Sequence, residues 1–169
     1  MIEEEGYDFK KTITMGAVRV LDFCREIELM NEELYLYFAD LFSENREVNA
    51  LWVKTANEEA NHAKQFELAI RLRNEMLESV SMDAWVVDAA SRFVRTLLES
   101  AKKSPPSLAD AVQLSIKLEE RLTKLHLECI AIFSDETYKE LFSAMMANDE
   151  RHLESLLDAQ KKYSTATHS

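Results

Sequence analysis

The sequence contains little glycine or proline, with two residues of each among 169. A sheet-rich fold of this length needs many turns, and turns depend heavily on these two residue types. Their scarcity argues against such a fold and favours long helices with few connections. The length is within the usual range for one domain. The sequence therefore predicts a single all-α domain over residues 1–169.

Basic residues are also few, since 20 lysines and arginines stand against 31 aspartates and glutamates. The formal net charge is −11 and the pI is near 4.9. A nucleic-acid partner requires a basic face that neutralises phosphates, and an anionic membrane surface attracts the same kind of face. The sequence has no run of basic residues, so we expect no nucleic-acid partner and no membrane partner.

Long apolar runs and a secretory pattern are missing as well. No apolar run approaches the roughly 20 residues that span a bilayer, and the acidic residues 1–6 lack the order of a signal peptide. The only two cysteines, Cys24 and Cys129, lie far apart and form no CxxC pair. We therefore expect buried thiols in the reducing environment of a cytoplasmic protein.

Apolar residues recur at three- and four-residue steps in four long segments, which is the spacing of amphipathic helices. The predicted helices span about residues 13–42, 47–77, 108–133 and 136–162. The crossover 78–107 contains a short amphipathic helix and ends at Pro105 and Pro106, through which a helix is not expected to run. Two tight connections and one long one predict a four-helix bundle of two helical hairpins joined by a crossover.

The two halves of the chain repeat the same polar pattern. Each half carries a lone acid, a second hydrogen-bonding residue seven positions later, and an acid–x–x–histidine pair. These residues are Glu28, Tyr35, Glu59 and His62 in the first half and Glu119, His126, Asp149 and His152 in the second. The two acids of a half are 31 residues apart in the first case and 30 in the second.

Residues three or seven apart project from the same face of a helix, and these positions coincide with the apolar stripe that faces the bundle interior. Burying an ionised carboxylate without a partner costs several kcal/mol. Few basic residues share the stripe to neutralise these acids, and Arg25 is the nearest candidate on the first helix. Two divalent cations would balance four carboxylates. The pattern therefore predicts a dinuclear metal site, although a single ExxH or a lone core histidine would carry little weight. The predicted ligands are Glu28, Glu59, His62, Glu119, Asp149 and His152.

Oxygen and nitrogen ligands with open positions suit Fe(II) and also Mn(II), with Zn(II) as a further substitute. Tyr35 and His126 share the inner stripe, where they could hydrogen-bond to a ligating acid or simply pack in the core. The acids beside the stripe are expected to be solvated. They are Glu32, Glu33, Glu58, Glu120 and Glu150.

The segments 28–39, 58–63 and 116–119 resemble the first three helices of rubrerythrins, and the resemblance spans about residues 13–157. It implies a ferritin-like fold with a carboxylate-bridged di-iron centre. By the family pattern Glu59 and Asp149 would bridge two iron ions, Glu28 and Glu119 would be terminal ligands, and each histidine would bind one ion.

Three features depart from that family pattern. The chain has no four-cysteine rubredoxin site, which in rubrerythrins supplies a built-in electron donor. Leu122 stands where the family has a further ligating glutamate, and Asp149 stands where it has the longer glutamate. The electron donor is therefore expected to be external.

These residues predict a cytoplasmic non-haem di-iron oxidoreductase that acts on peroxide or O2, or a ferroxidase. The alternatives are a non-catalytic iron-binding or iron-delivery protein and a metal-free helical interaction module. We also expect a homodimer, because apolar residues mark outer faces of the first helix and the crossover. These residues are Leu36, Phe38, Leu41, Trp85, Val86 and Phe93.

Overall fold

The computed structural model of the protein describes residues 12–72 and 79–164. Five helices make up most of these residues, as the scarcity of turn-forming residues predicted. The elements in chain order are β1 Thr12–Gly16, α1 Ala17–Leu41, α2 Arg46–Leu72, β2 Ser79–Asp83, α3 Ala84–Lys103, α4 Leu108–Ile132 and α5 Glu136–Ser164. The predicted end of the second helix, residues 73–77, lies outside the described residues.

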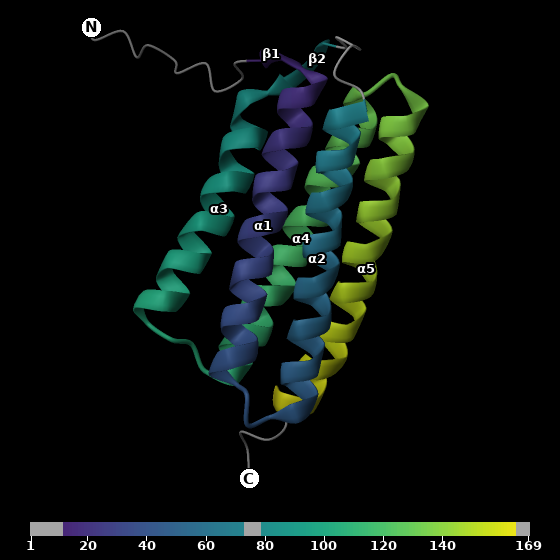
Figure 1. The fold of residues 1–169 in the computed structure, drawn as a ribbon. Coiled ribbons are helices and arrows are strands. Elements are labelled where there is room, and N and C mark those ends of the chain that lie inside the picture. The colour runs from purple at the N-terminus through teal and green to yellow at the C-terminus, as the bar shows by residue number, and fades with distance from the viewer. Residues whose placement is uncertain (1–11, 73–78, 165–169) are drawn as a thin grey trace, which may run out of the picture.

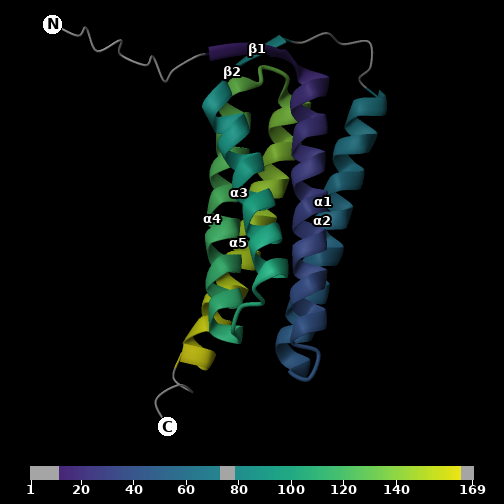
Figure 2. The ribbon, with the colours of Figure 1, turned by 90° about the vertical axis from the view of Figure 1, so that its left-hand side faces the viewer.

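The helices α1, α2, α4 and α5 stand side by side in a bundle (Figure 1). The helix α1 packs chiefly on α2, and α4 packs chiefly on α5, so each short connection closes a helical hairpin. The helix α3 flanks the bundle and contacts α1 and α4 (Figure 2). The two prolines before α4 stop α3 and force the chain to re-enter the bundle. The Ser107 side chain then caps α4 by accepting from the Asp110 backbone N–H.

A short antiparallel pair of strands closes one end of the bundle and was not predicted. Strand β1 pairs with β2 from Thr12 opposite Asp83 to Gly16 opposite Ser79. The predicted first helix began at Ile13, but residues 12–16 are extended and α1 begins at Ala17. Two five-residue strands are too short for an alternating pattern to stand out, and their pairing joins segments far apart in the sequence. The crossover helix is also longer than expected, because α3 runs over 20 residues.

Aromatic side chains fill the core on either side of the bundle's centre. On one side Trp52 lies 5.3 Å from Phe38 between ring centroids, and its indole Nε1 donates to Ser115 Oγ at 3.2 Å. This hydrogen bond ties α2 to α4 and thus one hairpin to the other. On the other side Phe142 lies 5.5 Å from Phe66 and 5.4 Å from Phe133.

Burial agrees with the sequence for the cysteines and corrects one apolar residue. Cys24 and Cys129 are both buried and unbridged, as predicted. Phe38, expected on an outer face of the first helix, is fully buried against Trp52, whereas Leu36 and Leu41 are exposed. The homodimer itself stays a prediction.

Within residues 12–72 and 79–164, none of the helices combines the length and the apolar character needed to cross a membrane.

Replacing Phe142 with alanine should lower the free energy of unfolding by about 3–5 kcal/mol, because the ring is fully buried among the rings of Phe66 on α2, His126 on α4 and Phe133 just after α4. Leu127→Ala is the matched control, because Leu127 is 55% exposed. The control should change the free energy by about 0.5 kcal/mol or less. Urea unfolding followed by circular dichroism measures both, and equal losses would contradict this description of the core.

Candidate metal centre

The six predicted ligands all lie inside the bundle, and none is more than 4% exposed. Helix α1 supplies Glu28, α2 supplies Glu59 and His62, α4 supplies Glu119, and α5 supplies Asp149 and His152. Within each acid–histidine pair the two residues lie about one helical turn apart on the inward face of the helix. This spacing directs both side chains toward the same space.

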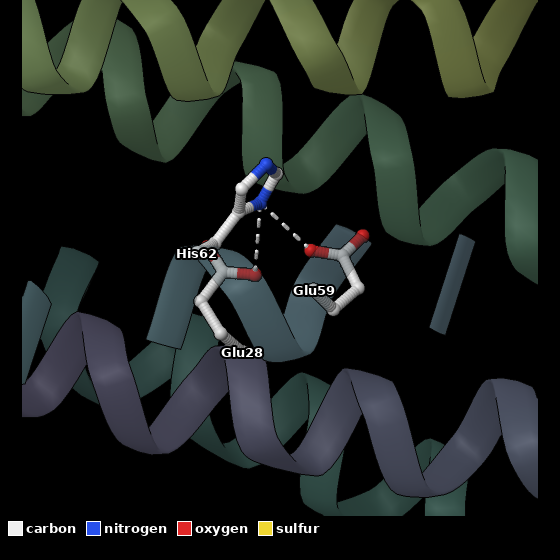
Figure 3. A group of neighbouring side chains, drawn as sticks. All are labelled: Glu28, Glu59 and His62. Carbon is white, nitrogen blue, oxygen red and sulfur yellow. Dashed lines mark hydrogen bonds and ion pairs between the residues drawn. The ribbon is translucent and has the colours of Figure 1, made fainter. Parts of the chain in front are cut away.

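Glu28, Glu59 and His62 form a first group whose ligand atoms all lie within 4.8 Å of one another. His62 Nδ1 is 3.1 Å from Glu59 Oε2 and 3.8 Å from Glu28 Oε2 (Figure 3). The two acids come from adjacent helices and converge on the same ring nitrogen. This arrangement offers two carboxylate oxygens and one imidazole nitrogen to a single cation.

Glu59, Glu119 and His152 form a second group with the same 4.8 Å limit. His152 Nδ1 is 3.3 Å from Glu59 Oε1 and 3.5 Å from Glu119 Oε2. Glu59 therefore belongs to both groups, with Oε2 facing His62 and Oε1 facing His152. A carboxylate placed in this way can bridge two cations.

Asp149 is in neither group. Its Oδ2 lies 2.7 Å from His126 Nδ1, and His126 Nε2 lies 3.4 Å from Glu28 Oε1. The aspartate is one methylene shorter than a glutamate, and its carboxylate pairs with the imidazole of α4. Five of the six predicted ligands are thus brought together, whereas a bridging role for Asp149 stays a prediction.

The two residues expected either to support the ligands or to pack in the core both contact predicted ligands. The Tyr35 hydroxyl donates a hydrogen bond to Glu119 Oε1, which leaves Oε2 directed toward His152. His126 lies between Asp149 and Glu28. Both Tyr35 and His126 are fully buried.

Two further residues at the centre were missed by the sequence analysis. Glu58 was expected to be solvated, but its Oε2 bonds to His152 Nε2 and its side chain is 34% exposed. Asn148 Nδ2 lies 2.7 Å from His62 Nε2. Each residue directly precedes the acid of an acid–histidine pair. That position could have drawn attention to both, although it gives no hint of which histidine each one contacts.

The histidine pKa values are raised by the surrounding acids. Burial alone lowers the pKa of His62, but the neighbouring carboxylates of Glu28 and Glu59 outweigh it and raise the pKa to about 10. Burial also lowers the pKa of His152, but Glu119 and Glu59 raise it to about 11. Without metal, both imidazoles are therefore protonated at pH 7 and balance part of the buried negative charge.

The carboxyl groups respond to burial in different ways. Burial raises the pKa of Glu59, and repulsion from Glu28 adds to the rise. Burial also raises the pKa of Glu119. For Glu28 burial acts in the same direction, but the nearby imidazoles of His126 and His62 outweigh it and hold the pKa below its ordinary value.

Several buried polar atoms at the centre have no hydrogen-bond partner among the described residues. They include both Glu28 carboxylate oxygens, Glu59 Oε1, Glu119 Oε2 and His152 Nδ1. Buried polar atoms are normally satisfied, and each one left without a partner costs on the order of 1–3 kcal/mol. The residues that carry these atoms make up the two groups, and the atoms are of the types that Fe(II), Mn(II) and Zn(II) bind. The residues present therefore fit two divalent cations.

No protein-family model, curated protein or solved structure matches this chain. The resemblance to rubrerythrins accordingly stays a prediction from the sequence motifs, and the metal centre is argued from its own geometry.

Metal binding should release protons, because His62 and His152 must each lose the Nδ1 proton before that nitrogen can bind a cation. Their pKa values of about 10 and about 11 lie above neutrality, so a rise in pH removes competing protons and should strengthen binding. Calorimetric titration with Co²⁺ at pH 7, in two buffers of different ionisation enthalpy, should show release of at least about one proton per ion. His152→Gln should release fewer protons, and identical heats in the two buffers would contradict the expectation.

Proposed function

We propose that this protein is a non-haem di-iron oxidoreductase that reduces peroxide or O2, or oxidises Fe(II), within a ferritin-like bundle related to rubrerythrins. The observation that carries the proposal is the position of Glu59, whose two carboxylate oxygens face two separate groups of buried ligand atoms. A single structural cation would need only one such group. Two groups that share one carboxylate favour two cations held close together.

The chain's own residues would divide the work of holding the ions. Glu28 and His62 would hold one ion, Glu119 and His152 the other, and Glu59 would join them. When bound, two iron ions supply one electron each, which matches the two-electron reduction of peroxide. Tyr35 fixes the Glu119 carboxylate by donating to its Oε1, and this contact keeps the second oxygen aimed at the centre.

Side chains around the ligands keep bulk water away from the centre. Phe66 and Phe142 pack against His126, with ring centroids 6.4 and 5.9 Å away. Leu122 is buried where the related family has a further ligand. Because the chain has two cysteines and no four-cysteine site, the proposal requires an external electron donor.

The second candidate function is iron binding without catalysis. It is favoured by Leu122, because an apolar side chain at that position removes one ligand that could stabilise the oxidised ions. The two functions share the same ligands and differ only in turnover, so kinetics separates them.

Anaerobic loading with Fe(II), followed by peroxide or air, tests the proposed function. We expect two iron ions per chain, rapid oxidation detected by a new ultraviolet–visible absorption, and repeated turnover when a chemical reductant is supplied. Uptake of two ions with no turnover of either oxidant would support the binding protein instead. Failure to bind any metal would contradict both and favour a helical interaction module.

Glu59→Ala should abolish binding of the ion pair, because it removes the only residue shared by both groups. A one-site ligand at 100 times its Kd stabilises the folded state by about 2.7 kcal/mol. Wild-type protein should therefore melt at a higher temperature with Mn²⁺ or Fe²⁺ than without, and Glu59→Ala should lose this increase. Glu150→Gln is the control, because Glu150 is exposed beside Asp149 and should retain the increase. A metal-dependent rise that survives in Glu59→Ala would argue against a shared carboxylate.

A further inference from the structure

The outer nitrogens of the two ligand histidines are bonded by residues from the opposite hairpin. Glu58 on α2 bonds to Nε2 of His152 on α5. Asn148 on α5 lies 2.7 Å from Nε2 of His62 on α2. Each of these residues directly precedes an acid of the sequence repeat, so the contacts are reciprocal. The two contacts differ in chemistry, since a carboxylate bonds to one histidine and an amide contacts the other.

This difference matters for the nitrogen that faces the centre. A carboxylate can only accept a hydrogen bond, so Glu58 holds a proton on His152 Nε2 and leaves Nδ1 available to a cation. An amide can donate or accept, so Asn148 does not favour one form of the His62 ring. Binding at His62 would require Asn148 to present its oxygen to a protonated Nε2. The negative charge of Glu58 also makes Nδ1 of His152 more basic, so that this nitrogen would bind a cation more strongly.

The three acids of the two groups do not differ in the number of their supporting contacts as the histidines differ in chemistry. Each terminal acid has one supporting contact, Glu119 with Tyr35 and Glu28 with His126. Glu59 is common to both groups. The backing of the two histidines is therefore the clearest chemical difference between the two positions.

We propose that Glu58 and Asn148 make the two metal positions unequal, so that the position formed by Glu59, Glu119 and His152 fills first and binds more tightly. This inference rests on the proposed two-metal centre and adds an order of filling to it. Glu58 and Asn148 act as positioning residues, since each contacts a ligand histidine. Outer hydrogen-bond partners of this kind change metal affinity by about 10–100-fold. Because Glu58 is 34% exposed, solvent screens its charge and the lower end of that range is expected.

Stepwise anaerobic titration of metal-free protein with Co²⁺ tests the proposal, with the visible absorption of the bound ion and calorimetry as readouts. Wild-type protein should bind two ions in two separate steps. Glu58→Gln should weaken the first step about tenfold and leave the second unchanged. Asn148→Asp should strengthen the second step, and a gain of affinity cannot arise from a folding defect. Glu120→Gln is the matched control, because Glu120 is exposed beside Glu119 and loses the same charge.

Two ligand variants identify the positions. Glu119→Gln should weaken the first step, and Glu28→Gln should weaken the second. Two equal steps in wild-type protein, or an unchanged first step in Glu58→Gln, would overturn the order of filling and leave the proposed two-metal function standing. Failure of wild-type protein to bind two ions would overturn both.

Discussion

Burial of four carboxylates and three imidazoles in the middle of a helical bundle is the constraint on which the structure depends. Each ionised group removed from water costs several kcal/mol unless an opposite charge or a hydrogen bond compensates it. Without metal, the histidines take up protons and offset part of the charge, as the raised pKa values of His62 and His152 indicate. The oxygens of Glu28, one oxygen of Glu59 and one of Glu119 still lack hydrogen-bond partners among the described residues. Two divalent cations would remove this deficit.

Four helices of the bundle each supply side chains to the buried centre. Each hairpin supplies one acid from its first helix and one acid–histidine pair from its second. Apolar packing on both sides stabilises the arrangement, with Trp52 and Phe38 at one side and the rings around Phe142 at the other. The Trp52–Ser115 hydrogen bond and the contacts of Glu58 and Asn148 join the hairpins through polar atoms. Stability and ligand geometry therefore depend on the same contacts between hairpins.

Spacing within single helices correctly placed most of the candidate side chains in the bundle interior, whereas their roles as metal ligands stay a prediction. Glu28, Glu59, His62, Glu119 and His152 were expected to meet, and the structure brings their ligand atoms together. Glu58 was expected to be solvated, because it lies beside the inner stripe. Its side chain is partly exposed, but nothing in the sequence indicated that it bonds to His152. Asp149 lies on the stripe as expected, but its carboxylate turns to His126. The β1–β2 pair was missed because strand pairing depends on a distant partner and not on local spacing.

The sequence by itself determined the helical content and the inner stripe of candidate ligands, because helical periodicity is a local property set by 3.6 residues per turn. Only the tertiary structure decided which histidine faces which acid, that Glu59 lies between two groups, and that Glu58 and Asn148 each back the histidine of the other hairpin. Those contacts depend on the rotation and offset of one helix against another. Spacing within a single helix carries no information about either quantity, since packing across the whole bundle sets them.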